Sequence, residues 1–280
     1  MLIDFHTHVG EREHYGPGFV AELARSWPEV VWEGRTLDEH RDAMRSVDRA
    51  IVLAFDARAS DLVVPNDYVA DYVREDPQRL IGFASVDPNR EDAHDRLDHA
   101  ISDLGLRGVK LGPIYQHFDP VAPQAIDFFR HIERLGVPVL CHQGTTFLRD
   151  APLRHARPWL LDEVASACPE LRLWIAHLGH PWCEETMAVI RKHPHLYADV
   201  SALHTRPLQL YHALMAAMEY RVADKLLFGT DYPFGEVEET IAALQHVNRL
   251  VDGTGLPRIS DAVVDGILDG ERHLADLGLE

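Results

Sequence analysis

Three features are scarce in this sequence: cysteine, basic residues and long hydrophobic runs. The 280 residues include only three cysteines, Cys141, Cys168 and Cys183, which are widely separated and form no C-x-x-C pair. This spacing argues against a disulfide framework or a zinc ribbon and is typical of a reducing compartment. No stretch approaches the roughly 20 apolar residues that a membrane helix needs, and no basic segment with a long apolar run opens the chain. The sequence therefore predicts a cytoplasmic protein.

Basic residues number 27 against 45 acidic residues, which gives a formal net charge of -18. Clustered Lys and Arg normally gather phosphate backbones and anionic lipids, so this charge argues against both as partners. A few local basic residues or a metal ion can still hold an anionic small molecule in a pocket. We therefore expect a small-molecule substrate, no nucleic acid and no membrane as partners. A homo-oligomer is also expected on general grounds, although the sequence indicates no interface.

Length and composition favour one compact α/β domain over residues 1–280. Hydrophobic residues make up 46% and charged residues 26% of the chain, which is ordinary for a globular protein. Eight short, nearly continuous apolar runs alternate with segments of helical spacing, which predicts parallel strands covered on both faces. The runs are Leu2 to Phe5, Ala50 to Phe55, Leu80 to Val86, Gly108 to Leu111, Val137 to Cys141, Leu171 to Ala176, Leu196 to Val200 and Leu226 to Phe228.

Eight such units favour a closed but distorted (β/α)8 TIM barrel over an open doubly wound sheet. Barrels of this kind commonly occupy roughly 250 residues as one domain, whereas open sheets typically have about five or six strands. The dinucleotide motif G-x-G-x-x-G of the open fold does not follow the first strand. We also expect the stretch from Gly10 to Asp48 to fold partly over the barrel mouth.

Polar residues stand at the ends of several predicted strands. His6 and His8 are two positions apart, so their side chains point the same way. His142, His177 and Asp231 follow the fifth, sixth and eighth strands. The carboxyl ends of barrel strands converge on one mouth, so these groups become neighbours. Imidazole and carboxylate donors suit Zn²⁺, and Mn²⁺, Fe²⁺ or Co²⁺ accept the same donors; the alternative is that they only hydrogen-bond within the barrel.

Five short motifs together resemble the amidohydrolase superfamily. More closely, the chain is similar to the amidohydrolase-related branch, which contains metal-dependent hydrolases and decarboxylases like aminocarboxymuconate-semialdehyde decarboxylase. The motifs are Asp4-Phe5-His6-Thr7-His8, Val109-Lys110-Leu111, His142-Gln143-Gly144, Ala176-His177-Leu178-Gly179 and Gly229-Thr230-Asp231-Tyr232-Pro233.

The resemblance implies one divalent metal ion held by His6, His8, His142 and Asp231, with His177 beside it as an acid/base group. A metal-bound water would have its pKa lowered toward about 7, and Asp231 would accept its proton during attack on a carbonyl. The expected activity is hydrolysis of a small carboxylated ester, lactone or amide. One alternative is nonoxidative decarboxylation of a small aromatic or unsaturated carboxylic acid, with a proton supplied by Asp231 or His177. A second alternative is a metal-binding protein without turnover.

Four further residues are candidates for substrate binding. Lys110 ends the fourth strand and has three interpretations: a carboxylated lysine that bridges two metals, an anchor for a substrate carboxylate, or an internal ion pair. Tyr115 follows the same strand, Arg149 lies in the loop after the fifth strand, and His180 lies three positions beyond His177. Each could instead pack or pair within its loop.

Overall fold

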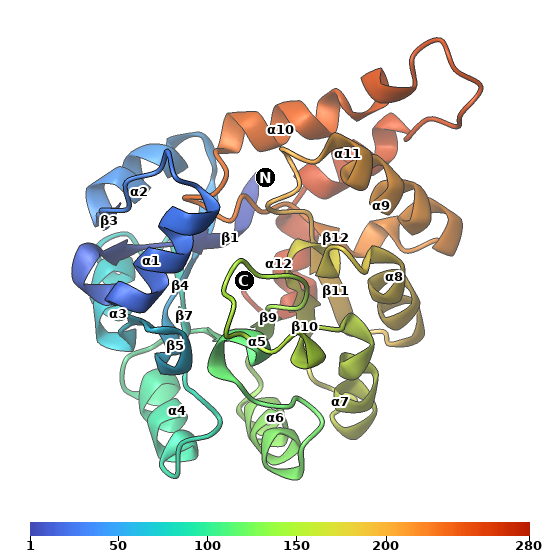
Figure 1. Ribbon diagram of the computed structural model, residues 1–280. Helices are drawn as coiled ribbons and strands as arrows, with labels where there is room; N and C mark the ends of the chain where they lie inside the picture. The colour runs from blue at the N-terminus through green and yellow to red at the C-terminus, as the bar shows by residue number, and fades with distance from the viewer.

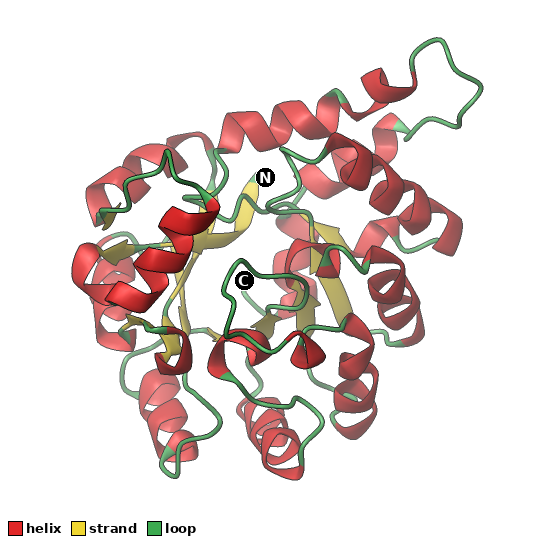
Figure 2. Cartoon of the chain, in the orientation of Figure 1, coloured by secondary structure: helices red, strands yellow, loops and turns green.

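The computed structural model describes all residues 1–280, and its centre is an eight-stranded parallel barrel ringed by helices (Figures 1 and 2). The strands follow one another around the barrel in chain order, each paired in parallel with the next. This arrangement confirms the predicted (β/α)8 fold, and every predicted run overlaps one barrel strand. The barrel strands are β1 (Ile3–His8), β4 (Arg49–Leu53), β7 (Leu80–Ala84), β8 (Gly108–Leu111), β9 (Val139–Cys141), β10 (Leu173–Ile175), β11 (Leu196–Asp199) and β12 (Leu226–Leu227).

The barrel closes where β1 meets β12 and the residues that follow it. The amide of Phe5 donates to the carbonyl of Phe228 at 3.0 Å, and the amide of Asp231 donates to the carbonyl of His6 at 2.8 Å. This seam is short because β12 has only two residues. Its consequence is that Asp231 lies directly beside the first strand.

A change of register in β1 separates the barrel interior from the mouth. The pairing of β1 with β4 shifts between Asp4 and Thr7, as in a β-bulge, which bends a strand and re-aims its side chains. Phe5 packs edge-on against Trp174 in the barrel interior, whereas the next side chain, His6, faces the polar groups of the mouth. The interior below the site is therefore filled by apolar side chains.

The helices lie outside the barrel and form a larger core against the outer faces of the strands. In α6, for example, Phe128, Phe129 and Ile132 point to the barrel, and Gly136 ends the helix in the left-handed conformation (φ 70°). The helices are α1 (Pro17–Ser26), α2 (Leu37–Ala43), α3 (Asn66–Glu75), α4 (Ala93–Ser102), α5 (Pro113–Gln116), α6 (Pro123–Leu135), α7 (Leu161–Ala167), α8 (Cys183–Lys192), α9 (Pro207–Tyr220), α10 (Val237–Gln245), α11 (Asp261–Leu268) and α12 (Glu271–Leu277).

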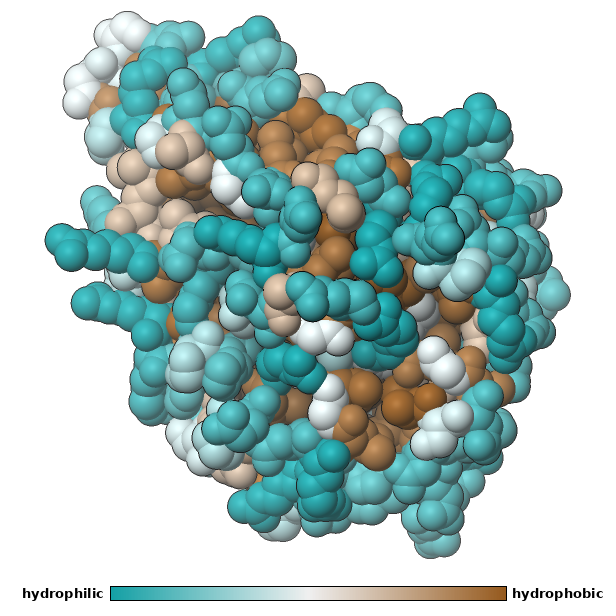
Figure 3. Space-filling model, turned by 180° about the vertical axis from the view of Figure 1, so that it is seen from behind, coloured by the Kyte–Doolittle hydropathy of each residue, from teal (hydrophilic) through white to brown (hydrophobic).

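The two ends of the barrel are covered differently. Leu274 and Leu277 of α12 join the interior cluster, so this helix closes the end away from the candidate site. Seen from behind, the surface is mostly hydrophilic, with hydrophobic side chains showing between the polar ones (Figure 3). No helix of the chain is long and apolar enough to cross a bilayer.

Small elements surround the other end, the mouth. Two antiparallel ribbons follow the first two barrel strands. The first pairs β2 (Gly10–Glu11) with β3 (Gly34–Arg35), and the second pairs β5 (Phe55–Ala57) with β6 (Leu62–Val64). Phe19 of α1 contributes to the lining of the mouth cavity, so the stretch between β1 and β4 covers part of the mouth, as expected.

Candidate active site

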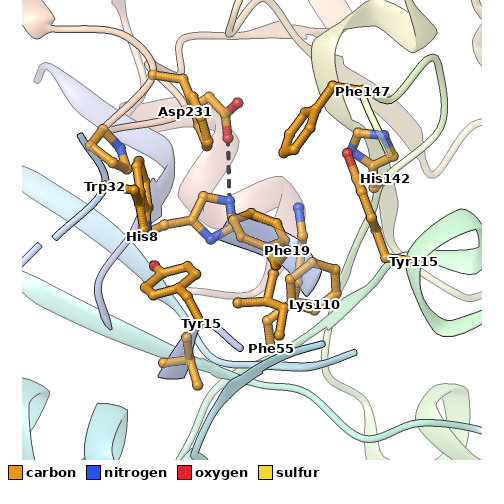
Figure 4. A pocket seen from close by; sticks show the side chains of 14 residues that line it. His8, Tyr15, Phe19, Trp32, Phe55, Lys110, Tyr115, His142, Phe147 and Asp231 are labelled. Carbon is orange, nitrogen blue, oxygen red and sulfur yellow. Dashed lines mark ion pairs between the residues drawn. The ribbon is translucent and has the colours of Figure 1, made fainter. Parts of the chain in front are cut away.

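The nitrogen atoms of two histidines and one carboxylate oxygen converge at the mouth. His6 Nε2 lies 3.2 Å from His8 Nε2, and Asp231 Oδ1 lies 3.3 Å from the first and 3.2 Å from the second. Figure 4 shows the His8–Asp231 pair among the side chains that line the cavity. The His6 side chain is fully buried, and the other two are largely buried. The structure therefore joins three residues that lie up to 225 positions apart in the sequence.

The hydrogen-bonding pattern shows that His6 presents a lone pair at this point. His6 Nδ1 donates to Asp199 Oδ2 at 3.0 Å, which leaves Nε2 unprotonated in the neutral ring. The Lys110 ammonium, 3.0 Å from the same Nε2, can only donate to it. A divalent cation placed among His6 Nε2, His8 Nε2 and Asp231 Oδ1 would be bound by one lone pair from each group. This donor set fits a divalent metal ion, and the carboxylate behind the histidine is typical of metal sites.

His142 lies beside this group without joining it. Its Nε2 donates to the carbonyl of Thr145 at 3.3 Å, which leaves Nδ1 with the lone pair. Its ring centroid is 5.1 Å from that of His177. No nitrogen of His142 completes a set of three donor atoms within 4.8 Å of one another. The structure thus brings together three of the four residues expected as ligands, and the role of His142 stays a prediction.

His177 stacks on His6, with ring centroids 4.8 Å apart. Its Nδ1 donates to Ser201 Oγ at 2.7 Å, because the Ser201 hydroxyl itself donates to Asp199. Nε2 therefore carries the lone pair and lies 3.9 Å from Asp231 Oδ2. This position beside the donor set, within reach of the cavity, is what the expected acid/base role requires.

Asp199 is a residue of this site that the sequence analysis missed. It is the last residue of β11 and is fully buried. Its carboxylate accepts hydrogen bonds from the His6 ring and from the backbone amide of His177 at 2.9 Å. An acidic residue at a strand end was the available signal, since Asp231 follows its strand in the same way. Because Asp199 is already bonded to His6 Nδ1, the set His6, His177 and Asp199 is a hydrogen-bond network rather than a second metal site.

Burial controls the protonation of the site. It lowers the pKa of His142 to about 3 and holds the pKa values of His6, His8 and His177 well below the usual value, so these rings are neutral, the form that binds metals. Burial also lowers the pKa of Lys110 to about 8, while Asp231 and Asp199 act in the opposite direction. The neutral histidines of the site are therefore in the form that binds a metal cation.

Two adjoining cavities open at the mouth and differ in character. One, of about 70 Å³, has apolar walls that include Tyr15, Phe19, Trp32 and Phe55. The other, of about 350 Å³, is lined mostly by polar residues, and we call it the polar cavity. Both share a set of residues next to the donor atoms: Tyr115, His142, Phe147, Asp231 and Phe234.

Three of the four candidates for substrate binding line one or both cavities, and the fourth does not. Lys110 lines the apolar cavity, Tyr115 lines both, and His180 lines the polar one. Arg149 lines neither: its guanidinium pairs with Glu22, and its side chain is 69% exposed. The prediction for Arg149 is corrected, because the loop after β9 turns this side chain outward to a carboxylate of α1.

A family model described as amidohydrolase matches residues 3–270. The chain is 26% identical over 198 residues to 2-amino-3-carboxymuconate-6-semialdehyde decarboxylase of Dictyostelium discoideum, a match that spans 60% of this chain and 55% of that relative. It is 24% identical over 296 residues to gamma-resorcylate decarboxylase of Polaromonas sp. strain JS666, across 85% of this chain and 89% of the relative.

Solved structures share the barrel. A probable 2-pyrone-4,6-dicarboxylic acid hydrolase from Acinetobacter baumannii superposes with a TM-score of 0.70 at 16% identity, covering 99% of both chains. A dihydroxybenzoic acid decarboxylase from Polaromonas sp. JS666, with bound manganese and an inhibitor, superposes with a TM-score of 0.64 at 17% identity, covering 99% of this chain and 97% of that one. At such identities the likeness shows the fold alone, and this fold supports both reactions.

These comparisons correct the expected activity. The curated relatives are decarboxylases, so the expectation of a hydrolase is wrong, and the alternative of decarboxylation is the better supported one. The residues of the site do not distinguish the two reactions, because both use the same metal ligands and the same proton-carrying groups. For that reason the sequence motifs alone led to the wrong first choice.

Proposed function

The chain belongs to the amidohydrolase family, and we propose that it is a metal-dependent, nonoxidative decarboxylase of a small aromatic or unsaturated carboxylic acid. The observation that carries the proposal is the convergence of His6, His8 and Asp231 beside His177 in a chain whose curated relatives are decarboxylases. The apolar cavity next to these groups supports a flat, unsaturated substrate, because aromatic side chains pack well against such rings.

His6, His8 and Asp231 would hold the metal, with His142 as the proposed fourth ligand. A divalent ion bound there would supply positive charge that stabilises the negative charge developing as the carbon–carbon bond breaks. Nitrogen and oxygen donors of this kind favour zinc, and manganese fits them as well. Manganese is the ion bound in the dihydroxybenzoic acid decarboxylase structure.

Lys110 and Tyr115 are proposed to position the substrate. Lys110 donates a hydrogen bond to His6 Nε2, which has a single lone pair. If that lone pair bound a metal ion, the Lys110 ammonium would be free to bind a substrate carboxylate. The ammonium also lies 5.7 Å from the ring centroid of Phe55, which holds it at the cavity wall. Tyr115 contacts the His142 ring edge-on and forms a wall shared by both cavities.

His177 and Asp231 are proposed to handle the proton. In decarboxylation the bond between the carboxyl carbon and its neighbour breaks, carbon dioxide leaves, and the electron pair stays on the substrate carbon. That carbon then takes a proton from Asp231, or from His177 once its Nε2 lone pair has accepted a proton from solvent, and the group that gave the proton is reprotonated by solvent. The hydrogen bonds that His177 donates, from Nδ1 to Ser201 and from its backbone amide to Asp199, keep Nε2 directed toward Asp231, where we propose that the transfer occurs.

Labelled substrates test the proposal directly. Metal-loaded protein is incubated with benzoates that carry ortho-hydroxyl groups, including gamma-resorcylate, and with unsaturated acids, each labelled with ¹³C in the carboxyl group. The expected result is release of labelled carbon dioxide, with one deuterium on the product carbon when the reaction runs in deuterated water. Release of a new acid from esters, lactones or amides, without carbon dioxide from any carboxylic acid, would contradict the proposal.

A further inference from the structure

The polar cavity contains a cluster of one arginine and two histidines that the proposed reaction does not use. Arg206, His180 and His204 line it, together with threonines, while Asp231 and His177 form its boundary with the donor atoms. These three basic residues come from the loops after β10 and β11. A substrate held at the donor atoms therefore extends either into the apolar cavity or toward this cluster.

Arg206 differs from the other arginines of the mouth because it has no carboxylate partner. Arg149 pairs with Glu22, and Arg157 pairs with Glu185, so the charges of both are already compensated. The only hydrogen bond from the half-buried Arg206 side chain is to a backbone carbonyl, that of Ala202, at 2.5 Å. An uncompensated guanidinium in a cavity is a binding group for an anion, since its planar fork matches a carboxylate.

The two histidines leave hydrogen-bonding capacity unused as well. The Nδ1 atoms of His180 and His204 are buried without a partner, and neither ring bonds to another group of the chain. Buried polar atoms without partners are rare in folded proteins and are commonly satisfied by a ligand or by water. Arg206 acts electrostatically on His180, His204 and Asp231, so each of these groups lies within electrostatic range of its guanidinium.

We infer that Arg206, His180 and His204 form a subsite for a second carboxylate of the substrate, which makes the substrate a small planar dicarboxylic acid. One carboxylate is lost at the donor atoms, and the other stays bound to Arg206 throughout. A cavity of about 350 Å³ accommodates a molecule of that size. This inference rests on the proposed function for its reaction, although the binding of a dianion is independent of turnover.

Binding of unreactive probes tests the subsite. The probes are isophthalate, its monomethyl ester and benzoate, and their dissociation constants are measured by calorimetry on the metal-loaded protein. The ester keeps the size of isophthalate and removes one charge, and the meta spacing prevents both carboxylates from chelating one ion. We expect isophthalate to bind at least about tenfold more tightly than the ester, because a charge-assisted bond to arginine is among the stronger hydrogen bonds.

Two variants, each of which removes one arginine charge, separate binding at the subsite from a general effect of net charge on anion binding. Arg206→Gln is expected to abolish the preference for isophthalate over the ester. Arg221→Gln removes an exposed arginine at the other end of α9 and is expected to keep it. If Arg206→Gln does not fold, Arg206→Lys is measured instead. Lysine keeps the charge but lacks the planar guanidinium, so the preference for isophthalate over the ester is expected to fall.

The outcomes distinguish this inference from the proposed function. Equal binding of isophthalate and its ester to the wild type, or an unchanged preference in the Arg206 variant, overturns the subsite. A protein that shows the preference but releases carbon dioxide from no acid keeps the subsite and loses the proposed function. Release of carbon dioxide from monocarboxylic acids, without any preference for the dianion, keeps the function and overturns the subsite.

Discussion

Asp199 Oδ2 accepts a hydrogen bond from His6 Nδ1 at 3.0 Å, across 193 positions of sequence. The same carboxylate binds the hydroxyl of Ser201, which in turn accepts from His177 Nδ1 at 2.7 Å. One buried carboxylate therefore sets the tautomer of a proposed metal ligand and of the proposed acid/base group. Groups behind the ligands often determine metal affinity in this way.

Asp199→Asn is expected to weaken metal binding by about 10- to 100-fold, because an amide does not enforce the His6 tautomer as a carboxylate does. Metal affinity is measured by competition with a fluorescent chelator. Asp162→Asn is the control, since Asp162 forms only a peripheral pair with Lys192 and His193. Unchanged affinity in the Asp199 variant would show that the network does not support the metal site.

His177→Asn is expected to lower kcat by about 10²- to 10⁴-fold while the metal is retained, because a positioned proton carrier contributes about that much. Turnover and metal content are measured on the same preparation. Ser201→Ala removes the acceptor of His177 Nδ1 and a donor to Asp199 but leaves the imidazole in place, so it should cause a smaller loss. Full turnover in His177→Asn would exclude the acid/base role of this residue.

Lys110→Met distinguishes the three interpretations of Lys110. If the ammonium binds a substrate carboxylate, KM rises by about 10- to 100-fold and the metal content stays at one ion, since a charge-assisted bond is worth about 1.5–3 kcal/mol. A carboxylated lysine predicts instead a loss from two ions to one. If Lys110 forms only an internal ion pair, the variant lowers the free energy of unfolding and leaves KM unchanged. Steady-state kinetics and elemental analysis of the same preparation separate the three cases.

Trp174→Ala is expected to destabilise the fold by about 3–5 kcal/mol, because it leaves a cavity in the barrel interior. The Trp174 side chain is fully buried, and its ring lies 5.4 Å from that of Phe83. Trp159→Ala is the control, since Trp159 is 62% exposed. Urea unfolding measures both; equal midpoints for the two variants would refute the assignment of Trp174 to the interior.

The strand pattern and the residues at strand ends were predictable from the sequence because barrel geometry is regular. His6, His8 and Asp231 meet because parallel strands carry their carboxyl ends to one mouth. Arg206 could not be predicted in the same way. Its place in the cavity depends on the conformation of the loop after β11, which no periodic pattern encodes.

The Arg149 prediction failed for a related reason. Whether an arginine in a mouth loop faces substrate or solvent depends on which carboxylate lies nearby in space. Glu22 lies 127 positions away in α1, and only the folded chain shows that it pairs with Arg149. The sequence likewise could not separate decarboxylation from hydrolysis, because the ligands are common to both reactions.

Elemental analysis of the purified protein tests the central claim, a metal ion held at the barrel mouth, most directly. Wild type and His6→Ala are compared after reconstitution with zinc or manganese, and intact mass reports carboxylation of Lys110. We predict about one ion per chain in the wild type, none in His6→Ala, and no added carboxyl group. No bound ion in the reconstituted wild type would contradict the account, and the histidines and Asp231 would then act on the substrate without a metal.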